Sequence, residues 1–150
     1  MKKKDFNSSK VTEVKKGSCL CGAVKYEVHG PLFDVLHCHC RNCRKQNGHF
    51  SASTGCKKND LKIFGEENLA WYNSVKDVTK GVKRGFCSVC GSVLVWNPED
   101  GDDLWFSAGS LDDVSGIKVR GHIWTSEKGD YYEISDGLPQ YERDPDDPSL

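Results

Sequence analysis

Apolar and polar residues alternate in the segment that begins at Val24. Val24, Tyr26 and Val28 are separated by single charged residues. A period of two is typical of a strand that buries one face. Gly30 and Pro31 follow and indicate where the strand ends. The pattern therefore predicts a half-buried strand from Val24 to Val28.

Further short strands are expected along the rest of the chain, separated by turn-forming residues at 58–60, 97–101 and 136–137. They are predicted at Phe33–His37, Phe50–Thr54, Leu61–Phe64, Leu69–Tyr72, Val82–Phe86, Ser92–Trp96, Leu104–Ala108, Val119–Trp124 and Tyr131–Ile134. One or two helical turns are expected over Arg41–Asn47, ended by Gly48. Many short strands with no long helical pattern indicate a mainly β fold.

The length of 150 residues is that of one domain. We expect this domain to span residues 17–142. A flexible arm with six lysines is predicted over residues 1–16, and an acidic tail over residues 143–150. A run of lysines is usually a solvated surface, so the arm by itself indicates no partner.

The net charge of −1 disfavours a nucleic-acid-binding protein, which usually carries a basic surplus. No apolar run approaches the roughly 20 residues of a membrane span, so no membrane partner is expected. The lysines at the N-terminus are not followed by the apolar stretch of a signal peptide. We therefore expect the protein in a reducing compartment, the cytoplasm.

Eight cysteines need an explanation in such a compartment. They form two close pairs, one group of three and a single residue: Cys19 and Cys21, Cys87 and Cys90, Cys38 with Cys40 and Cys43, and Cys56. Disulfides are one interpretation, but they are rare where thiols are kept reduced. Short cysteine pairs from distant segments are typical of zinc sites, because zinc binds four converging thiolates.

The grouping predicts two different zinc sites. Two pairs, each followed by a glycine, would form a closed site of four thiolates: Cys19, Cys21, Cys87 and Cys90. The remaining group supplies three ligands within six residues: Cys38, Cys40 and Cys43. Four protein ligands are typical of a structural zinc, and three with an open position of a catalytic zinc. Cys56 is either a fourth ligand of the second site or a buried inert thiol.

The same motifs resemble those of the glutathione-dependent formaldehyde-activating enzyme family, which shares its domain with centromere protein V. The resemblance covers about residues 17–142. It rests on the runs Gly17-Ser18-Cys19-Leu20-Cys21-Gly22-Ala23-Val24, Cys38-His39-Cys40-Arg41-Asn42-Cys43-Arg44-Lys45 and Phe86-Cys87-Ser88-Val89-Cys90-Gly91-Ser92, and on Gly109–Asp113, His122–Trp124 and Asp136–Pro139. Three cysteine groups in this order and spacing are a specific signal.

The resemblance implies coiled β-sheets, here several short-stranded antiparallel sheets stapled by zinc. It implies a structural zinc on Cys19, Cys21, Cys87 and Cys90, and a catalytic-type zinc on Cys38, Cys40 and Cys43. We expect the catalytic-type zinc to be the more labile of the two ions. It also implies carbon–sulfur lyase chemistry between glutathione, or a related thiol, and formaldehyde. The alternative is a non-catalytic, zinc-stabilised binding module whose ligand is undetermined.

Other side chains near the group of three have open roles. The side chain of His39 should point away from its neighbouring sulfurs if the segment is extended. His37 and His49 are candidate hydrogen-bond donors to sulfur. The basic residues of the expected helix either bind carboxylates of glutathione or form a solvated face: Arg41, Arg44 and Lys45. Three aromatic residues either line a pocket or belong to the core: Phe50, Trp71 and Trp124.

Overall fold

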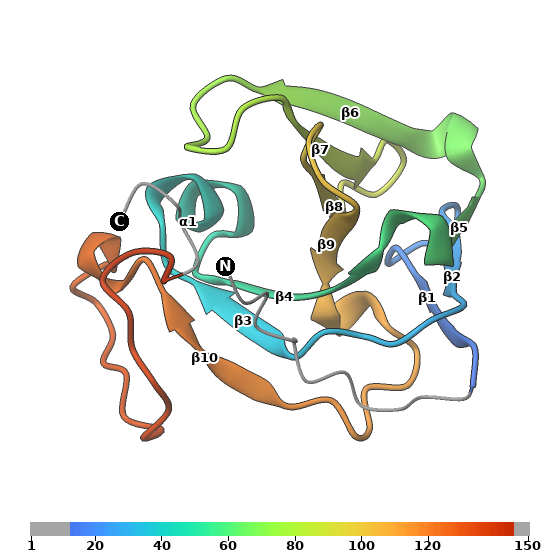
Figure 1. Ribbon diagram of the computed structural model, residues 1–150. Coiled ribbons are helices and arrows are strands. Elements are labelled where there is room, and N and C mark those ends of the chain that lie inside the picture. The colour runs from blue at the N-terminus through green and yellow to red at the C-terminus, as the bar shows by residue number, and fades with distance from the viewer. Residues whose placement is uncertain (1–12, 146–150) are drawn as a thin grey trace.

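The computed structural model describes residues 13–145, which form two β-sheets and one α-helix (Figure 1). The smaller sheet has the order β1-β2-β5, with β1 at Lys15–Ser18, β2 at Lys25–Val28 and β5 at Leu61–Phe64. The expected mainly β fold is confirmed. β1 begins inside the expected N-terminal arm, and most of that arm and of the acidic tail lies outside the described residues.

The larger sheet has seven strands in the order β10-β3-β4-β9-β8-β7-β6. Their bounds are β3 Val35–Cys38, β4 Ser51–Lys57, β6 Leu69–Ser74, β7 Val82–Cys87, β8 Val93–Asn97, β9 Asp103–Ser107 and β10 Val119–Ile123. In Figure 1, β3 and β4 run across the strands β8 and β9, so the sheet is strongly coiled. Short 3-10 turns occur at Lys58–Asp60, Glu66–Asn68, Ala108–Ser110 and Thr125–Glu127.

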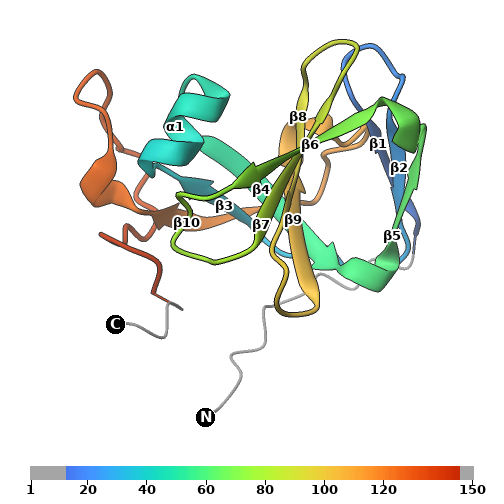
Figure 2. The ribbon, with the colours of Figure 1, turned by 90° about the horizontal axis from the view of Figure 1, so that it is seen from above.

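The helix α1 spans Arg41–Asn47, as the sequence predicts. Gly48 ends it with φ of 76°, a conformation that favours glycine, and its amide donates to the carbonyl of Arg44 at 2.9 Å. In Figure 2, α1 and the C-terminal segment lie at one end of the molecule and β1, β2 and β5 at the other. Within residues 13–145, no helix has the length and apolar character needed to cross a bilayer.

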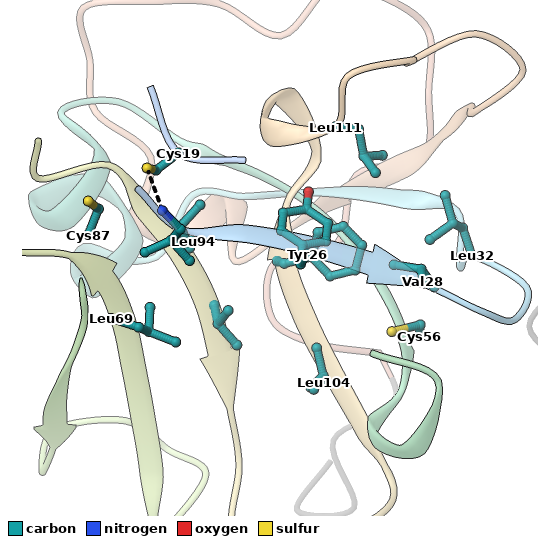
Figure 3. Close-up of a cluster of buried hydrophobic side chains, with 13 residues drawn as sticks. Cys19, Tyr26, Val28, Leu32, Cys56, Leu69, Cys87, Leu94, Leu104 and Leu111 are labelled. Atoms are coloured by element: carbon teal, nitrogen blue, oxygen red, sulfur yellow. Dashed lines mark hydrogen bonds between the residues drawn. The ribbon is translucent and has the colours of Figure 1, made fainter. Parts of the chain in front are cut away.

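The core lies between the two sheets and is built around Tyr26 and Phe106 (Figure 3). Their rings meet edge to face with centroids 5.2 Å apart, and the Tyr26 hydroxyl hydrogen-bonds the Ser110 hydroxyl at 2.7 Å. Aliphatic residues from both sheets and from the loops beside them fill the remaining space: Val24, Val28, Leu32, Leu69, Leu94, Val95, Leu104 and Leu111. Cys19 and Cys87 are buried at one end of this cluster, and Cys56 lies at the other end.

Two expectations about strands need correction. Strand β10 pairs with β3 in parallel, whereas all sheets were expected to be antiparallel. Only strands joined by a tight hairpin must be antiparallel, and β3 and β10 are far apart in the chain. The strand predicted at 131–134 is absent. The edge of β10 is instead covered by the segment around Pro139, whose carbonyl accepts from the His122 amide at 2.8 Å.

Candidate metal centres

Two turns from opposite sheets bring four cysteines together. Cys19 and Cys21 follow β1, Cys87 ends β7, and Cys90 lies in the turn before β8. Their sulfur atoms lie within 4.8 Å of one another, with 3.6 Å between Cys19 and Cys21 and 3.8 Å between Cys21 and Cys87. Zinc–sulfur bonds of about 2.3 Å in a tetrahedron place the sulfurs about 3.8 Å apart. The cluster therefore fits a four-coordinate zinc.

The backbone of both turns is arranged around the sulfurs. The amide of Val24 donates to Cys19 Sγ at 3.3 Å, and the amide of Cys90 donates to Cys87 Sγ at 3.4 Å. The glycines that follow the two pairs, Gly22 and Gly91, have φ of 79° and 77°, so each chain can turn back sharply after its pair. Amide donors stabilise thiolates, which are the form that binds metal.

Ser92 is a polar residue of this site to which the sequence analysis assigned no role. Its hydroxyl accepts from the Leu20 amide at 2.9 Å, which joins the two cysteine turns directly. It also lies 3.2 Å from Cys90 Sγ, and hydrogen bonding to Ser92 lowers the pKa of Cys90 to about 5. Its position directly after the Cys90-Gly91 pair is the signal that could have identified it.

The second cluster is local in sequence and lies where β3 meets α1. Cys38 is the last residue of β3, Cys40 caps the N-terminus of α1, and Cys43 belongs to its first turn. The three sulfur atoms lie within 4.8 Å of one another, and the Cys43 amide donates to Cys40 Sγ at 3.4 Å. Among residues 13–145, no fourth cysteine, histidine or carboxylate joins them within that distance.

The second cluster favours a thiolate at Cys43. Hydrogen bonds from Cys38 and Cys40 lower the pKa of the Cys43 thiol far below its ordinary value, with a hydrogen bond to Ser51 and the charge of Arg84 acting in the same direction. The same hydrogen bonds raise the pKa of Cys38. The pKa of Cys40 is raised as well, so the cluster by itself favours one thiolate, at Cys43, and the other two thiolates would need the positive charge of a metal ion.

Arg84 is a second residue that the sequence analysis missed. It lies on β7 and is 5% exposed, and its guanidinium bonds Asp77 at 2.6 Å and Gln46 of α1 at 2.6 Å. Burial opposes its charge, but the hydrogen bonds to Asp77 and the nearby Cys43 raise its pKa above the ordinary value. Arg84 is two residues after the buried Val82 in β7, so the two side chains lie on the same face of the strand. This alternation is the only local signal that Arg84 points inward.

The segment between β6 and β7 is held against α1 by the same group of side chains. Asn42, next to Cys43 in the sequence, donates to the Lys76 carbonyl at 3.2 Å and to Asp77 at 3.3 Å. The same segment borders a groove of about 540 Å³ lined by lysines and acidic residues, including Lys80, Lys83 and Glu99. No cysteine lines that groove, but Asp77, which bonds Arg84 beside the second cluster, does.

His39 is 1% exposed and bonds no sulfur. Its Nδ1 is hydrogen-bonded to the Tyr132 hydroxyl, and its Nε2 lies 2.9 Å from His122 Nδ1. Burial lowers the pKa of His39 to about 4, and the charges of neighbouring histidines act in the same direction. This placement agrees with the expectation that His39 points away from the sulfurs beside it.

The remaining histidine, aromatic and basic candidates from the sequence differ in how close they lie to the cysteine clusters. His49 Nδ1 bonds the Tyr131 hydroxyl at 3.0 Å, so a role for His49 as a donor to sulfur has no support. Phe50 packs against the rings of His37 and His39, whereas Trp71 is 43% exposed and belongs to neither the core nor a cysteine cluster. The basic residues of α1 lie along the second cluster, with Arg41 and Lys45 exposed and Arg44 half-buried.

Cys56 is fully buried in β4, within the hydrophobic core. Burial raises the pKa of its thiol to about 12, with Asp60 and Asp103 contributing. It belongs to neither cysteine cluster, as Figure 3 shows for its separation from Cys19 and Cys87. Of the two interpretations of this residue, the structure favours the buried inert thiol.

Known proteins resemble this chain in sequence and structure. A sequence model of the family described as glutathione-dependent formaldehyde-activating enzyme matches residues 14–127. A Halomonas elongata protein, whose name assigns it provisionally to that enzyme, is 31% identical over 125 residues, covering 79% of this chain and 80% of its own. The crystal structure of a Rhodobacter sphaeroides protein superposes with a TM-score of 0.55 at 28% identity, covering 67% of this chain and 91% of that one.

The family match contains both cysteine clusters and β1 to β10. All of the motifs that suggested the family, except Asp136–Pro139, are therefore part of one continuous match. The chain belongs to the glutathione-dependent formaldehyde-activating enzyme family.

Proposed function

We propose that the protein is a zinc-dependent carbon–sulfur lyase that forms or cleaves the S-hydroxymethyl adduct of glutathione or a related thiol. The observation that carries this proposal is the cluster of three sulfurs, Cys38, Cys40 and Cys43, with no fourth ligand near them in the described residues. Family membership supplies the two substrates, glutathione and formaldehyde.

Two zinc ions per chain fit the cysteines. Four sulfurs would bind a structural ion, and the three sulfurs of the second cluster would bind a more labile one, since three ligands bind more weakly than four. Held by Cys38, Cys40 and Cys43, zinc would supply an open position for an external thiol and would lower the pKa of that thiol. The negative charge of three thiolates favours this role over the activation of water.

The protein's own side chains support a thiolate at this position. The Arg84 guanidinium, fixed by Asp77, offsets negative charge next to Cys43. Arg44 is half-buried on α1, and its buried Nε has no hydrogen-bond partner in the described part of the chain. Guanidinium groups bind carboxylates strongly, so the α1 cations are candidate contacts for the two carboxylates of glutathione.

The proposed reaction needs no further reagent. In the forward direction, the sulfur of glutathione forms a bond to the carbon of formaldehyde, and the carbonyl oxygen ends with the proton that the thiol loses. In the reverse direction, the carbon–sulfur bond breaks, and the hydroxyl proton returns to sulfur. All eight cysteines are free in the structure, and the activity therefore fits the reducing environment of the cytoplasm.

Titration of the zinc-loaded protein with glutathione and with S-methylglutathione tests the proposal. Glutathione should bind and release a proton, because its thiol must ionise to bind metal. The methylated compound cannot form a thiolate and should bind at least tenfold more weakly. Loss of formaldehyde in the presence of glutathione should be faster with protein than in the uncatalysed reaction.

The outcomes separate the two functions. Equal binding of both compounds, or binding of neither, would show that sulfur does not bind at the second cluster, and the zinc-stabilised binding module would then be the better description. Glutathione binding without faster loss of formaldehyde would show that the site takes thiols but that formaldehyde is not its substrate. Cys43→Ala is the matched control, because it removes one sulfur of the second cluster and leaves the first intact.

A further inference from the structure

Two histidines and a carboxylate meet outside both cysteine clusters. His37 on β3 and His122 on β10 are direct partners in the parallel pairing of these strands. Asp136 comes from the irregular segment after β10, and its Oδ2 lies 2.9 Å from His122 Nε2. One ring nitrogen of each histidine and one oxygen of Asp136 all lie within 4.8 Å of one another.

His37 contributes a buried polar atom that no protein group satisfies. Its Nδ1 is inaccessible and has no hydrogen-bond partner in the described residues. The ring packs against Phe50 with centroids 4.6 Å apart and against His122 with centroids 5.1 Å apart. A buried nitrogen without a partner costs about 1–3 kcal/mol, so its presence beside two other metal-binding side chains points to a missing ligand.

The carboxylate of Asp136 is held in place by the backbone. The Leu138 amide donates to Asp136 Oδ1 at 3.0 Å, while Oδ2 lies at His122 Nε2. Neutral imidazoles and a carboxylate bind divalent transition metals without first losing a proton.

Side chains behind the cluster can fix the orientation of His122. A histidine that binds a metal through one nitrogen usually donates the N–H of the other to a nearby acceptor. With Nε2 on a metal, His122 would donate from Nδ1 to His39 Nε2, which lies 2.9 Å away. His39 would then donate from Nδ1 to the Tyr132 hydroxyl. In this series of hydrogen bonds, both ring nitrogens of His122 and of His39 would have a partner.

The competing arrangement has no metal. His122 would donate from Nε2 to Asp136, and the hydrogen bonds to His39 and Tyr132 would run in the opposite direction. That arrangement satisfies His122 and His39 but leaves the buried Nδ1 of His37 unpaired. A metal ion bound through His37 Nδ1 would give that nitrogen its partner, and we therefore favour the arrangement with a metal.

We propose that His37, His122 and Asp136 form a third metal site, which takes a divalent transition metal ion that prefers nitrogen and oxygen ligands, such as Zn²⁺ or Co²⁺. Two imidazoles and one carboxylate are a common set for such ions and leave further positions open. The site goes beyond the proposed lyase function and does not depend on it. It would anchor the segment after β10, which already bonds His122 through the Pro139 carbonyl and the Tyr141 amide.

Metal titration of the whole protein tests this site. Both cysteine clusters are first filled with Zn²⁺, and Co²⁺ is then added while metal content and visible absorption are measured. We expect one further equivalent of metal, with the weak absorption of nitrogen and oxygen ligands and no sulfur-to-cobalt charge-transfer band. Bound metal should also slow proteolysis of the segment after β10.

Variants assign the third equivalent to this cluster. Asp136→Asn changes an exposed residue, should leave the fold and both zinc ions in place, and should weaken Co²⁺ binding at least tenfold. His37→Phe, which keeps a ring against Phe50, should have the same effect. Asp130→Asn is the matched control, because Asp130 is an exposed carboxylate of the same segment outside the cluster.

Three results would overturn the assignment. The first is that metal binding to the wild-type protein saturates at two equivalents. The second is that the added Co²⁺ shows thiolate charge-transfer absorption. The third is that both Asp136→Asn and His37→Phe still bind the third equivalent of metal. None of these results depends on glutathione or formaldehyde. The third site can therefore fail while the lyase function stands, and the reverse is equally possible.

Discussion

Arg84 Nη2 donates a hydrogen bond to Asp77 Oδ1 across 2.6 Å, and the exposed fractions of the two side chains are only 7% and 9%. The pair lies between the loop after β6 and the helix that holds Cys43. A buried ion pair adds little net stability, because both charges lose their hydration. Its effect here is to fix a positive charge beside the second cysteine cluster.

Asp77→Ala should lower the free energy of unfolding by about 3–5 kcal/mol, because it leaves the buried guanidinium of Arg84 without its charged partner. Chemical denaturation of the zinc-loaded protein measures this change. Asp103→Ala is the control, since the Lys57–Asp103 pair is exposed and should contribute at most about 1 kcal/mol. Similar losses in the two variants would contradict a buried pair.

The two cysteine clusters should differ in their effect on folding. Structural zinc sites contribute about 10–16 kcal/mol of binding free energy, which is comparable to the whole stability of a domain, about 5–15 kcal/mol. Alanine in place of Cys19, Cys21, Cys87 or Cys90 should therefore unfold or insolubilise the protein. Thermal melting and metal analysis measure both properties.

Cys38→Ala and Cys43→Ala should instead leave a folded protein that lacks one zinc ion. The second cluster joins only the end of β3 to α1, whereas the first joins turns from both sheets. A chelator should likewise remove one equivalent of zinc first, without unfolding. Equal damage from variants of the two clusters would show that both sites are structural.

The sequence was most informative where chemistry is local. The three cysteines around α1 lie within six residues, and Gly48 marks the end of the helix Arg41–Asn47 that the structure confirms. Cysteine pairs also indicate distant contacts, because zinc needs four ligands and two pairs supply them. Residue type and spacing were thus enough to group seven of the eight cysteines as the structure groups them.

The contacts that could not be predicted join residues far apart in the chain. His39 bonds Tyr132 and His122, which are 93 and 83 residues away. These contacts depend on the parallel pairing of β3 with β10, and no local pattern encodes the direction or register of strands so distant in the sequence. Two adjacent tyrosines suggested a strand at 131–134, but their rings pack on histidines instead.

Cys56→Ser should leave both zinc equivalents in place and lower the free energy of unfolding by about 1–3 kcal/mol. Cys56 is fully buried among apolar side chains, so a serine hydroxyl there would lose its hydration and gain no hydrogen bond from those side chains in return. Because the thiol has its pKa raised to about 12, it should also resist thiol reagents at pH 8 in the folded protein. Loss of one zinc equivalent would instead identify Cys56 as a ligand.

His39 should make stability depend on pH between about 4 and 6.5. Burial lowers its pKa to about 4 in the folded protein, against 6.5 for an ordinary histidine. The unfolded chain therefore binds more protons than the folded one in this window, and stability rises with pH there. The contribution is fully present above pH 6.5 and is lost as the pH falls toward 4. Its upper limit is on the order of 3 kcal/mol.

Cysteine ligands also bind protons in acid, so the test of His39 needs a comparison between variants. His39→Phe keeps a ring beside Phe50 and Tyr132 but cannot be protonated. Its free energy of unfolding, measured by denaturation from pH 4 to 7, should rise less steeply with pH than that of the wild type. His29→Phe is the control, because His29 is more exposed and its side chain hydrogen-bonds only Glu27 in the described structure. Parallel curves for wild type and His39→Phe would mean that His39 has an ordinary pKa, and the zinc ligands would then account for all of the acid sensitivity.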